Sequence, residues 1–209
     1  MQALAPRRAN IRTAHGVDYC GSRHPVLKKL QADIPPEFHG GQLWRSSFMV
    51  MEYLLEHPLA FGTRVVEVGC GWGLLGIFCA KTFGCDVLLT DKDARVFPYV
   101  RAHLELNGMT LNTAERDFRD FRPEHFISCD VMLGSDICFW PEHVGILKKL
   151  IAQALQANVQ MIILADPGRY TFMQVARHCE EHFHCKLLKR RSLDKKNSGY
   201  LLVIKNSTP

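Results

Sequence analysis

The order of apolar and polar residues along the chain divides it into alternating strands and helices. From residue 63 onward, short apolar runs alternate with longer stretches in which apolar residues recur every three or four positions. Short apolar runs are typical of strands buried on both faces, and the longer spacing is typical of helices that cover a sheet. The pattern predicts strands at 63–69, 85–91, 112–118, 129–136 and 159–166, and helices that end at Lys81 or span 94–108, 143–157 and 171–183.

Two further strands follow the last helix, in CKLLKRRSL (185–193) and GYLLVIKN (199–206). The segment between them, SLDKKNSGY (192–200), is too short for a helical crossover, so we expect an antiparallel hairpin. The whole pattern predicts an α/β fold with a Rossmann-like, doubly wound, seven-stranded and mostly parallel sheet that ends in this hairpin. A reversed hairpin at the end of the sheet departs from the standard dinucleotide-binding fold.

The first 60 residues have a different pattern. Residues 24–33 and 45–58 each have helical spacing, and the turn-rich segment 34–42 connects them. We expect residues 1–60 to be an N-terminal helical extension that packs over the ligand site. Residues 61–209 would form the core, within a single compact domain.

The composition is that of an ordinary globular protein. Of the 209 residues, 47% are hydrophobic and 22% are charged, and the formal net charge is +5. No stretch approaches the roughly 18 uninterrupted apolar residues that span a bilayer, and the N-terminus lacks an apolar secretory core. We interpret the basic segment 1–14 as a tail, with an organelle-targeting segment as the alternative. These features exclude a membrane-spanning protein.

The cysteines indicate a reduced compartment. There are eight, none in a C-x-x-C pair, and several lie within apolar runs, where cysteine behaves as a small buried hydrophobe. This usage is typical of a cytoplasmic protein rather than of a disulfide framework. No coiled-coil pattern is present, so we expect a monomer.

Two local clusters carry weaker signals. The basic run 186–196 is typical of a solvated strand end and loop, with a binding patch for nucleic acid as the minority interpretation. The segment HCEEHFHC (178–185) resembles a metal cluster. On a helix, however, Cys179 continues the apolar face while His178 and His182 share a more polar one, so we predict no metal site.

A glycine-rich loop follows the first predicted strand, in VVEVGCGWGLLG (65–76). Residues 71–76 match G-x-G-x-x-G, but this pattern alone suits a phosphate or a carboxylate equally well. Glu67 discriminates, because its carboxylate at the strand tip would repel a pyrophosphate and attract an ammonium group. A ligand with an amino-acid end therefore fits better. The alternative is that Glu67 caps the amides of the loop, and the two roles are compatible.

Acidic residues also end the next two strands. Asp91 is placed to accept hydrogen bonds from both hydroxyls of a ribose, which indicates a nucleoside without saying which one. Asp117 in AERDF follows the third strand, where its carboxylate would accept from an adenine amino group while Phe118 lies against the ring. A surface turn is the alternative for Asp117, and the sequence supports the two equally.

Together these motifs resemble the class I, or seven-β-strand, S-adenosylmethionine-dependent methyltransferases. The resemblance lies in EVGCGWG (67–73), in TD at the second strand tip and in RDF at the third, and it covers roughly residues 63–205. That family also has the reversed terminal hairpin. The resemblance implies that the methionine part of S-adenosyl-L-methionine is surrounded by Glu67, Gly69, Gly71 and Gly73, its ribose held by Asp91, and its adenine by Asp117 and Phe118.

A narrower resemblance comes from three further segments. DICF (136–139) is similar to the D-x-x-Y/F motif of the family 16 methyltransferases, most of which modify protein lysines, and HGGQLWRSS (39–47) and ADPGRY (165–170) resemble the same group. The resemblance implies that Trp44 lies against the cofactor. The fourth strand tip has neither N-P-P-Y nor Pro-Cys, which disfavours methylation of adenine or glutamine amide and of pyrimidine carbon 5.

The methyl acceptor is expected at this fourth strand tip. Asp136 would orient an acceptor amine and Phe139 would help form its site, so these are the expected catalytic residues. Trp140 and Tyr170 would wall the substrate pocket with aromatic faces that attract cations. Simple loop packing is the alternative for Trp140 and Tyr170, and loop capping is the alternative for Asp136.

The sequence therefore predicts an S-adenosylmethionine-dependent N-methyltransferase that modifies a lysine side chain of a protein partner, without a membrane or nucleic-acid partner. Two alternatives remain open. One is a methyltransferase for a small amine or an RNA, and the other is a non-catalytic binding protein of the same fold. An NAD oxidoreductase is opposed by Glu67 and by the terminal hairpin.

Overall fold

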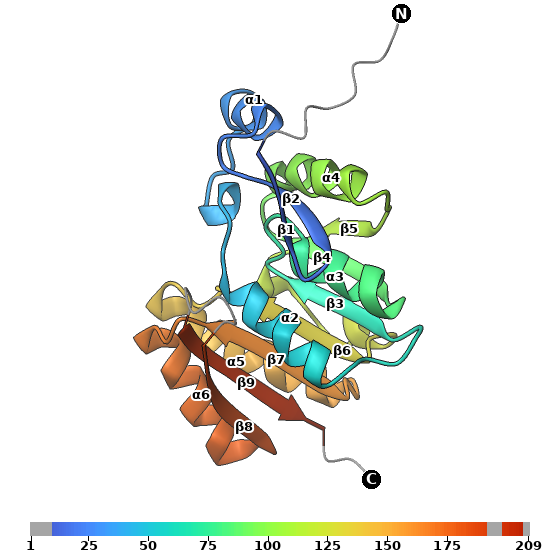
Figure 1. Ribbon diagram of the computed structural model, residues 1–209. Coiled ribbons are helices and arrows are strands. Elements are labelled where there is room, and N and C mark those ends of the chain that lie inside the picture. The colour runs from blue at the N-terminus through green and yellow to red at the C-terminus, as the bar shows by residue number, and fades with distance from the viewer. Residues whose placement is uncertain (1–9, 192–197, 207–209) are drawn as a thin grey trace, which may run out of the picture.

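A seven-stranded sheet forms the centre of the molecule (Figure 1). The computed structural model describes residues 10–191 and 198–206. The strands lie in the order β5-β4-β3-β6-β7-β9-β8. Their bounds are β3 Arg64–Val68, β4 Asp86–Asp91, β5 Asn112–Glu115, β6 Val131–Ser135, β7 Met161–Asp166, β8 Cys185–Arg191 and β9 Ser198–Lys205.

The sheet is parallel except where β9 pairs with β7 and with β8. Within the group β3 to β7, each pair of neighbouring strands is parallel. Strand β9 lies between β7 and β8 and is antiparallel to both, with Ile163 opposite Val203 and Leu187 opposite Leu202. The predicted mostly parallel, seven-stranded sheet with a C-terminal antiparallel hairpin is therefore confirmed. The connection 192–197, which includes the end of the basic run, lies outside the described residues.

Helices cover both faces of the sheet. One face carries α2 (Ser46–Glu56), α3 (Leu74–Phe83) and α4 (Phe97–Leu106), and the other carries α5 (Pro141–Gln156) and α6 (Tyr170–His182). Side chains alternate along each strand, so Val65 packs with the first group of helices while Val66 and Val68 pack with the second. The apolar runs of the sequence are thus strands buried on both sides, as the doubly wound fold requires.

The N-terminal segment packs on the face of α2, α3 and α4. It contains β1 (Ile11–Ala14), β2 (Val17–Cys20), α1 (Pro25–Asp33) and the short helix η1 (His39–Gly41). The β1–β2 hairpin contacts α3 and α4, and α2 contacts β6, β7 and β9. Residues 1–9 of the basic tail lie outside the described residues.

Sequence patterning did not predict the β1–β2 hairpin. Its strands have only four residues each, too few for a clear alternation. The turn is made by His15 and Gly16, whose φ angles of 49° and 81° are both positive, as a two-residue hairpin turn of the primed type requires. Glycine accepts such an angle readily, but His-Gly is a weak turn signal, so the sequence gave little indication of a hairpin here.

Three smaller features complete the fold. Strand β5 ends at Glu115, earlier than predicted, and the next residues form the short helices η3 (Phe118–Asp120) and η4 (Pro123–Phe126). Another short helix, η2 (Ala94–Val96), precedes α4. Among the helices of the described residues, none has the length and hydropathy needed to cross a bilayer.

A buried histidine joins the N-terminal hairpin to α4. The side chain of His103 is inaccessible to solvent and stacks on Trp72, with 5.0 Å between the ring centroids. Its Nδ1–H donates to the carbonyl of Tyr99 at 2.8 Å, and its Nε2 accepts from the backbone N–H of Cys20 at 3.3 Å. Both nitrogens are used by the neutral ring, and burial lowers the pKa of His103 to about 4.

This histidine should make the protein sensitive to mild acid. The unfolded chain takes up a proton near pH 6.5 and the folded chain only near pH 4, so acid favours unfolding. Between pH 7 and pH 4.5 we expect this group to lower the free energy of unfolding by about 2–3 kcal/mol. Urea unfolding at both pH values checks this, and His103→Gln, which keeps a donor and an acceptor, should lose that part of the pH dependence. Equal pH dependence in both proteins would contradict the assignment.

Candidate functional site

The glycine loop connects β3 to α3 at the carboxyl end of the sheet. Gly69, Gly71 and Gly73 have φ angles of 66°, 52° and 71°, a region that favours glycine. A Cβ on Gly69 would lie 2.7 Å from Ile137, and one on Gly73 would lie 3.0 Å from Leu89. A Cβ on Gly71 would meet no atom within 4 Å. Gly73 therefore serves helix packing, whereas Gly71 borders open space.

Glu67 lies beneath this loop. Its side chain is buried, and Oε2 accepts a hydrogen bond from the backbone N–H of Gly76 at 2.8 Å. Burial raises the pKa of Glu67 to about 8, and the negative charge of Asp91 adds to the effect. At neutral pH the carboxyl group therefore keeps its proton until a cation comes close.

Asp91, at the end of β4, holds the loop from the other side. Its two oxygens accept from the backbone N–H groups of Gly71 at 3.0 Å and of Asp93 at 3.1 Å. Burial raises the pKa of Asp91. Asp117, by contrast, is bound by Arg119 through the backbone N–H and two guanidinium nitrogens. The guanidinium of Arg119 lowers the pKa of Asp117.

Two adjoining cavities, of about 30 and 80 Å³, lie against the glycine loop and share Trp44, Gly69, Gly71 and Ser135. Of the residues expected from the sequence, nine line one or both: Trp44, Glu67, Gly69, Gly71, Asp91, Phe118, Asp136, Phe139 and Trp140. Gly73, Asp117 and Tyr170 line neither cavity. Tyr170 is 78% exposed on the first turn of α6.

A larger hollow of about 700 Å³ lies elsewhere, between the end of α2 and the open face of β8 and β9. It includes Met161 and Cys185, the first residues of β7 and β8. Ligands of doubly wound sheets bind at the carboxyl ends of the strands, and none of the expected site residues lines this hollow. We therefore place the functional site at the smaller cavities.

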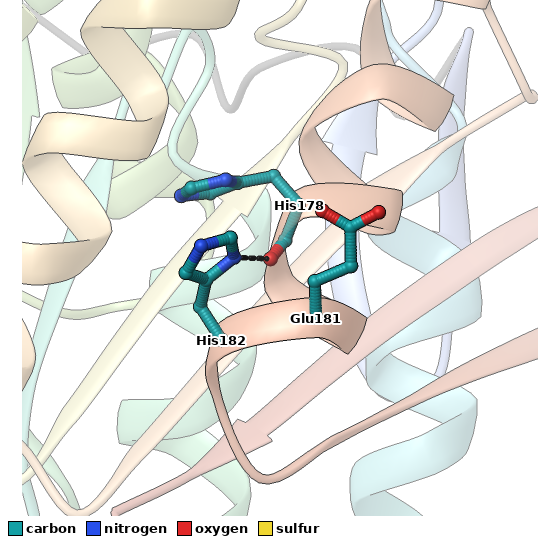
Figure 2. Close-up of side chains that lie close together, drawn as sticks. All are labelled: His178, Glu181 and His182. Carbon is teal, nitrogen blue, oxygen red and sulfur yellow. Dashed lines mark hydrogen bonds between the residues drawn. The ribbon is translucent and has the colours of Figure 1, made fainter.

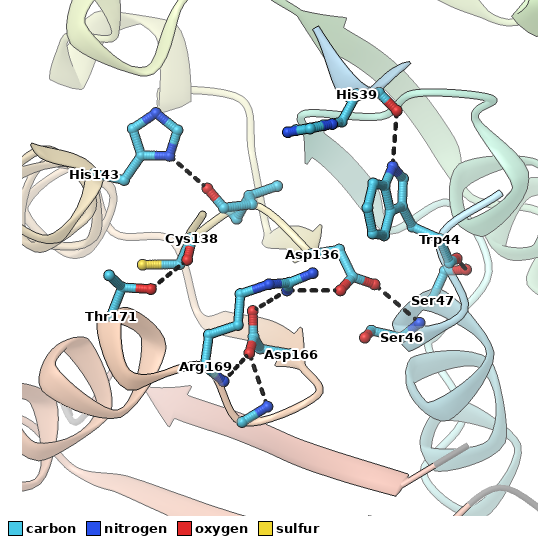
Figure 3. A network of polar contacts seen from close by, with 12 residues as sticks. His39, Trp44, Ser46, Ser47, Asp136, Cys138, His143, Asp166, Arg169 and Thr171 are labelled. Atoms are coloured by element: carbon cyan, nitrogen blue, oxygen red, sulfur yellow. Dashed lines mark hydrogen bonds and ion pairs between the residues drawn. The ribbon is translucent and has the colours of Figure 1, made fainter. Parts of the chain in front are cut away.

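A network of carboxylates and one arginine organises the tip of β6 (Figure 3). Asp136 is 5% exposed and has a φ of 55°. Its Oδ2 accepts from the backbone N–H of Ser46 at 3.1 Å, and its Oδ1 from Nη1 of Arg169 at 2.9 Å. The same nitrogen donates to Oδ2 of the buried Asp166 at 2.6 Å. The network thus ties together the starts of α2 and α6 and the ends of β6 and β7.

Five rings form an aromatic cluster beside this network: Phe38, His39, Trp44, Phe139 and Trp140. His39 stacks on Trp140 with 5.4 Å between centroids and lies 4.7 Å from the centroid of Phe139. The indole N–H of Trp44 donates to the carbonyl of His39 at 2.8 Å, as Figure 3 shows. Residues 38–44 of the N-terminal segment therefore form one wall of the 80 Å³ cavity at the glycine loop.

Two cations face the aromatic cluster. The ammonium of Lys92 lies 3.3 Å from the ring centroid of Phe38 and 5.5 Å from that of Trp140. The guanidinium of Arg169 lies 4.0 Å from the centroid of Phe139. These contacts are close enough for cation–π attraction. Lys92 lines the cavity at Asp136 together with the aromatic rings, whereas the charge of Arg169 is balanced by Asp136 and Asp166.

His39, Lys92 and Arg169 were not among the residues expected from the sequence. His39 and Arg169 lie within the segments HGGQLWRSS and ADPGRY that carried the narrower resemblance, and Lys92 follows Asp91 directly. Their proximity to the expected residues was the available signal. Some partners are near in sequence, such as Asp166 for Arg169, but the contacts with Asp136, Phe139 and Trp140 join distant segments and were not visible in the sequence.

Comparison with known proteins yields one family and many related folds. A sequence profile of the family described as lysine methyltransferase matches residues 30–189. The chain is 32% identical over 138 residues to a histidine protein methyltransferase 1 homolog of Dictyostelium discoideum, covering 60% of this chain and 42% of that one. It is 28% identical to a calmodulin-lysine N-methyltransferase of Arabidopsis thaliana, covering 55% and 40%. The chain thus spans less than half the length of these two relatives.

Solved structures agree on the fold. The tRNA (uracil-54, C5)-methyltransferase of Pyrococcus abyssi, in complex with S-adenosyl-L-homocysteine, superposes with a TM-score of 0.61 at 16% identity. The match covers 93% of this chain and 42% of that chain. At such low identity the likeness concerns the arrangement of the sheet and its helices, and not the acceptor.

Proposed function

Because the chain belongs to the lysine methyltransferase family, we propose that it transfers a methyl group from S-adenosylmethionine to a lysine side chain of a protein. One observation carries this proposal. The aromatic cluster, the buried carboxylate of Asp136 and Asp91 line one of two adjoining cavities, Glu67 lines the other, and the glycine loop borders both. A cofactor with an amino-acid end and a nucleoside end and an amine acceptor would therefore lie against one another there.

The residues around the two adjoining cavities fit the cofactor. Gly71 leaves open the space that a side chain would fill, and the first N–H groups of α3 suit a carboxylate. The indole Nε1 of Trp72, which lines the smaller cavity, is buried without a hydrogen-bond partner among the described residues. Glu67 would hold the ammonium of the methionine part, and Asp91 the ribose. When bound, S-adenosylmethionine supplies a methyl group made electrophilic by its sulfonium.

We keep Phe118 in the proposed adenine site and give Asp117 a different role. Phe118 lines the cavity and supports packing against the adenine. Asp117 does not line it, and its carboxylate is already bound by Arg119, so we assign it the role of holding the β5–η3 turn that presents Phe118.

The acceptor amine must be neutral to attack, and the site favours that form. The ammonium of Lys92 and burial against the aromatic rings would lower the pKa of an approaching lysine, whereas the charge of Arg169 is balanced by Asp136 and Asp166. The half-buried rings of Trp44, Phe139 and Trp140 supply apolar surface around this position. Each oxygen of Asp136 accepts one hydrogen bond from the described residues and has a second lone pair, so Asp136 can still accept from the amine and orient it.

A labelling experiment tests the proposal. The protein is incubated with a lysate and methyl-labelled S-adenosylmethionine, and labelled protein bands are hydrolysed for amino-acid analysis. We expect label in one or a few protein bands, recovered as methyl-lysine, and none with the Gly71→Arg variant. Methyl-histidine would overturn the choice of lysine. Label in RNA or in small molecules would overturn the protein substrate, and no label despite cofactor binding would overturn the enzyme.

Cofactor binding should also release a proton. In the free protein Glu67 keeps its proton up to about pH 8, and an ammonium beside it would lower that pKa. The affinity for S-adenosylhomocysteine should therefore rise up to about tenfold per pH unit toward pH 8. Calorimetry at pH 7 in buffers of different ionisation enthalpy should report close to one proton released. Glu67→Gln should bind more weakly and release none, and proton release unchanged in that variant would contradict the role of Glu67.

A further inference from the structure

The last turn of α6 carries two histidines and a glutamate on one face of the helix (Figure 2). His178, Glu181 and His182 are spaced i, i+3 and i+4, which places them side by side. One ligand atom from each lies within 4.8 Å of the other two. Cys179 of the same motif is fully buried in the core between α5 and α6, so it takes no part.

The hydrogen bonding of His182 prepares it as a ligand. Its Nδ1 lies 2.8 Å from the carbonyl oxygen of His178, so this nitrogen carries the proton and donates it. The Nε2 atom then has its lone pair free. A histidine that ligates a metal commonly donates its other N–H to a carbonyl in this way, which fixes the tautomer and the direction of the ring.

The rings and the helix end also suit a cation. The ring centroids of His178 and His182 are 4.2 Å apart with 32° between their planes, so a small rotation turns both nitrogens toward one point. Glu181 is exposed, so its carboxylate can turn toward the imidazoles without disturbing the core or the hydrogen bond of His182. The carbonyl groups at the end of α6 add a partial negative charge. The opposing charge nearby is Lys148 of α5, which acts on His178.

From this geometry we propose that His178, Glu181 and His182 form a binding site for a divalent transition-metal ion of the zinc class. Two imidazole nitrogens and one carboxylate oxygen are the donors that Zn²⁺ prefers, whereas Mg²⁺ and Ca²⁺ prefer oxygen. Donors on a tetrahedral zinc lie about 3.4 Å apart, so modest side-chain rotation is needed, and water completes the fourth position.

The site is separate from the proposed methyl-transfer site. Arg169 and the cavity lie at the start of α6, and His182 is its last residue. A helix of 13 residues is about 20 Å long, so an ion there would not touch the acceptor. The ion would instead join consecutive turns at the end of α6 and stabilise the folded protein by mass action.

Zinc titration of the full-length chain, free of any histidine tag and treated with a chelator beforehand, tests the site. By calorimetry we expect one Zn²⁺ per chain, with affinity at least about tenfold weaker in His178→Ala and in His182→Ala. Glu181→Gln should have a smaller effect in the same direction, and Lys148→Met should strengthen binding. Zinc should raise the Tm of the wild type but not of the double histidine variant.

Two matched controls separate this site from other ligands. His184→Ala removes an exposed histidine just beyond the cluster, and Cys185→Ser removes the cysteine that is least buried. Both variants should bind zinc as the wild type does. Unchanged zinc binding in the double histidine variant, loss of binding in either control, or equal affinity for Mg²⁺ would overturn the proposal. Circular dichroism confirms that each variant is folded.

Discussion

Replacing Gly71 with arginine is expected to weaken the binding of S-adenosylhomocysteine by more than about 100-fold. Gly71 borders both cavities, and a Cβ at this position would enter open space rather than protein. An arginine side chain would therefore fill the place that we assign to the cofactor, and its charge would oppose the ammonium near Glu67. Calorimetric titration of the variant with S-adenosylhomocysteine measures the loss.

Gly108→Arg is the matched control. Gly108 has a φ of 65°, and a Cβ there would also meet no atom of the described residues within 4 Å, but it lies between α4 and β5, at the amino end of the strands. Both variants pay the backbone cost of a side chain at positive φ, about 1 kcal/mol. Equal loss of affinity in both would assign the effect to folding, and unchanged affinity in Gly71→Arg would refute the proposed location of the cofactor.

Replacing Asp136 with alanine is expected to lower kcat by about 10²–10³-fold while the affinity for S-adenosylhomocysteine changes little. Asp136 lines the cavity together with Phe139, and its hydrogen bonds go to Ser46 and Arg169 rather than to the residues assigned to the cofactor. The variant also leaves the N–H of Ser46 without its acceptor, so it should be less stable by about 1–3 kcal/mol. Steady-state kinetics on the identified substrate, with thermal unfolding alongside, measures both effects.

Asp136→Asn distinguishes orientation of the amine from support of the fold. Asparagine keeps an oxygen that can accept from Ser46, and Arg169 keeps its ion pair with Asp166. We expect this variant to recover most of the stability but little of the activity. Full activity in either variant would remove Asp136 from the reaction. Recovery of activity in proportion to stability would leave it a structural role only.

The sheet was predictable because its physical causes are local. Strand residues such as Val65 and Val66 must both be apolar when helices cover both faces of the sheet. The sequence therefore shows each such strand as a continuous apolar run. The β1–β2 hairpin was not predicted because strands of four residues are too short to show an alternation of apolar and polar residues. Its conformation depends instead on contacts with α3 and α4. Tertiary packing, rather than the local sequence, determines that element.

The candidate site was predictable in part, for a similar reason. Residues at the tips of parallel strands meet at one edge of the sheet, so Glu67, Asp91 and Asp136 were expected near one another. The position of Arg169 was not, because its ion pair with Asp136 joins residues 33 positions apart, although its other partner, Asp166, is a near neighbour in the chain. Nor did the sequence show that Arg119 would bind Asp117, or that Tyr170 would lie on the surface.

The position of β9 has a consequence for how the chain is made. It is the last of the seven strands to leave the ribosome, yet it lies between β7 and β8 rather than at an edge. Until β9 emerges, β7 is an open edge and β8 has no partner strand in the sheet. The nascent chain therefore exposes an apolar strand, Met161–Asp166, for as long as synthesis of about 40 further residues takes. A truncation before β9 would leave the same edge open permanently, and such a product is expected to aggregate rather than to persist as a smaller enzyme.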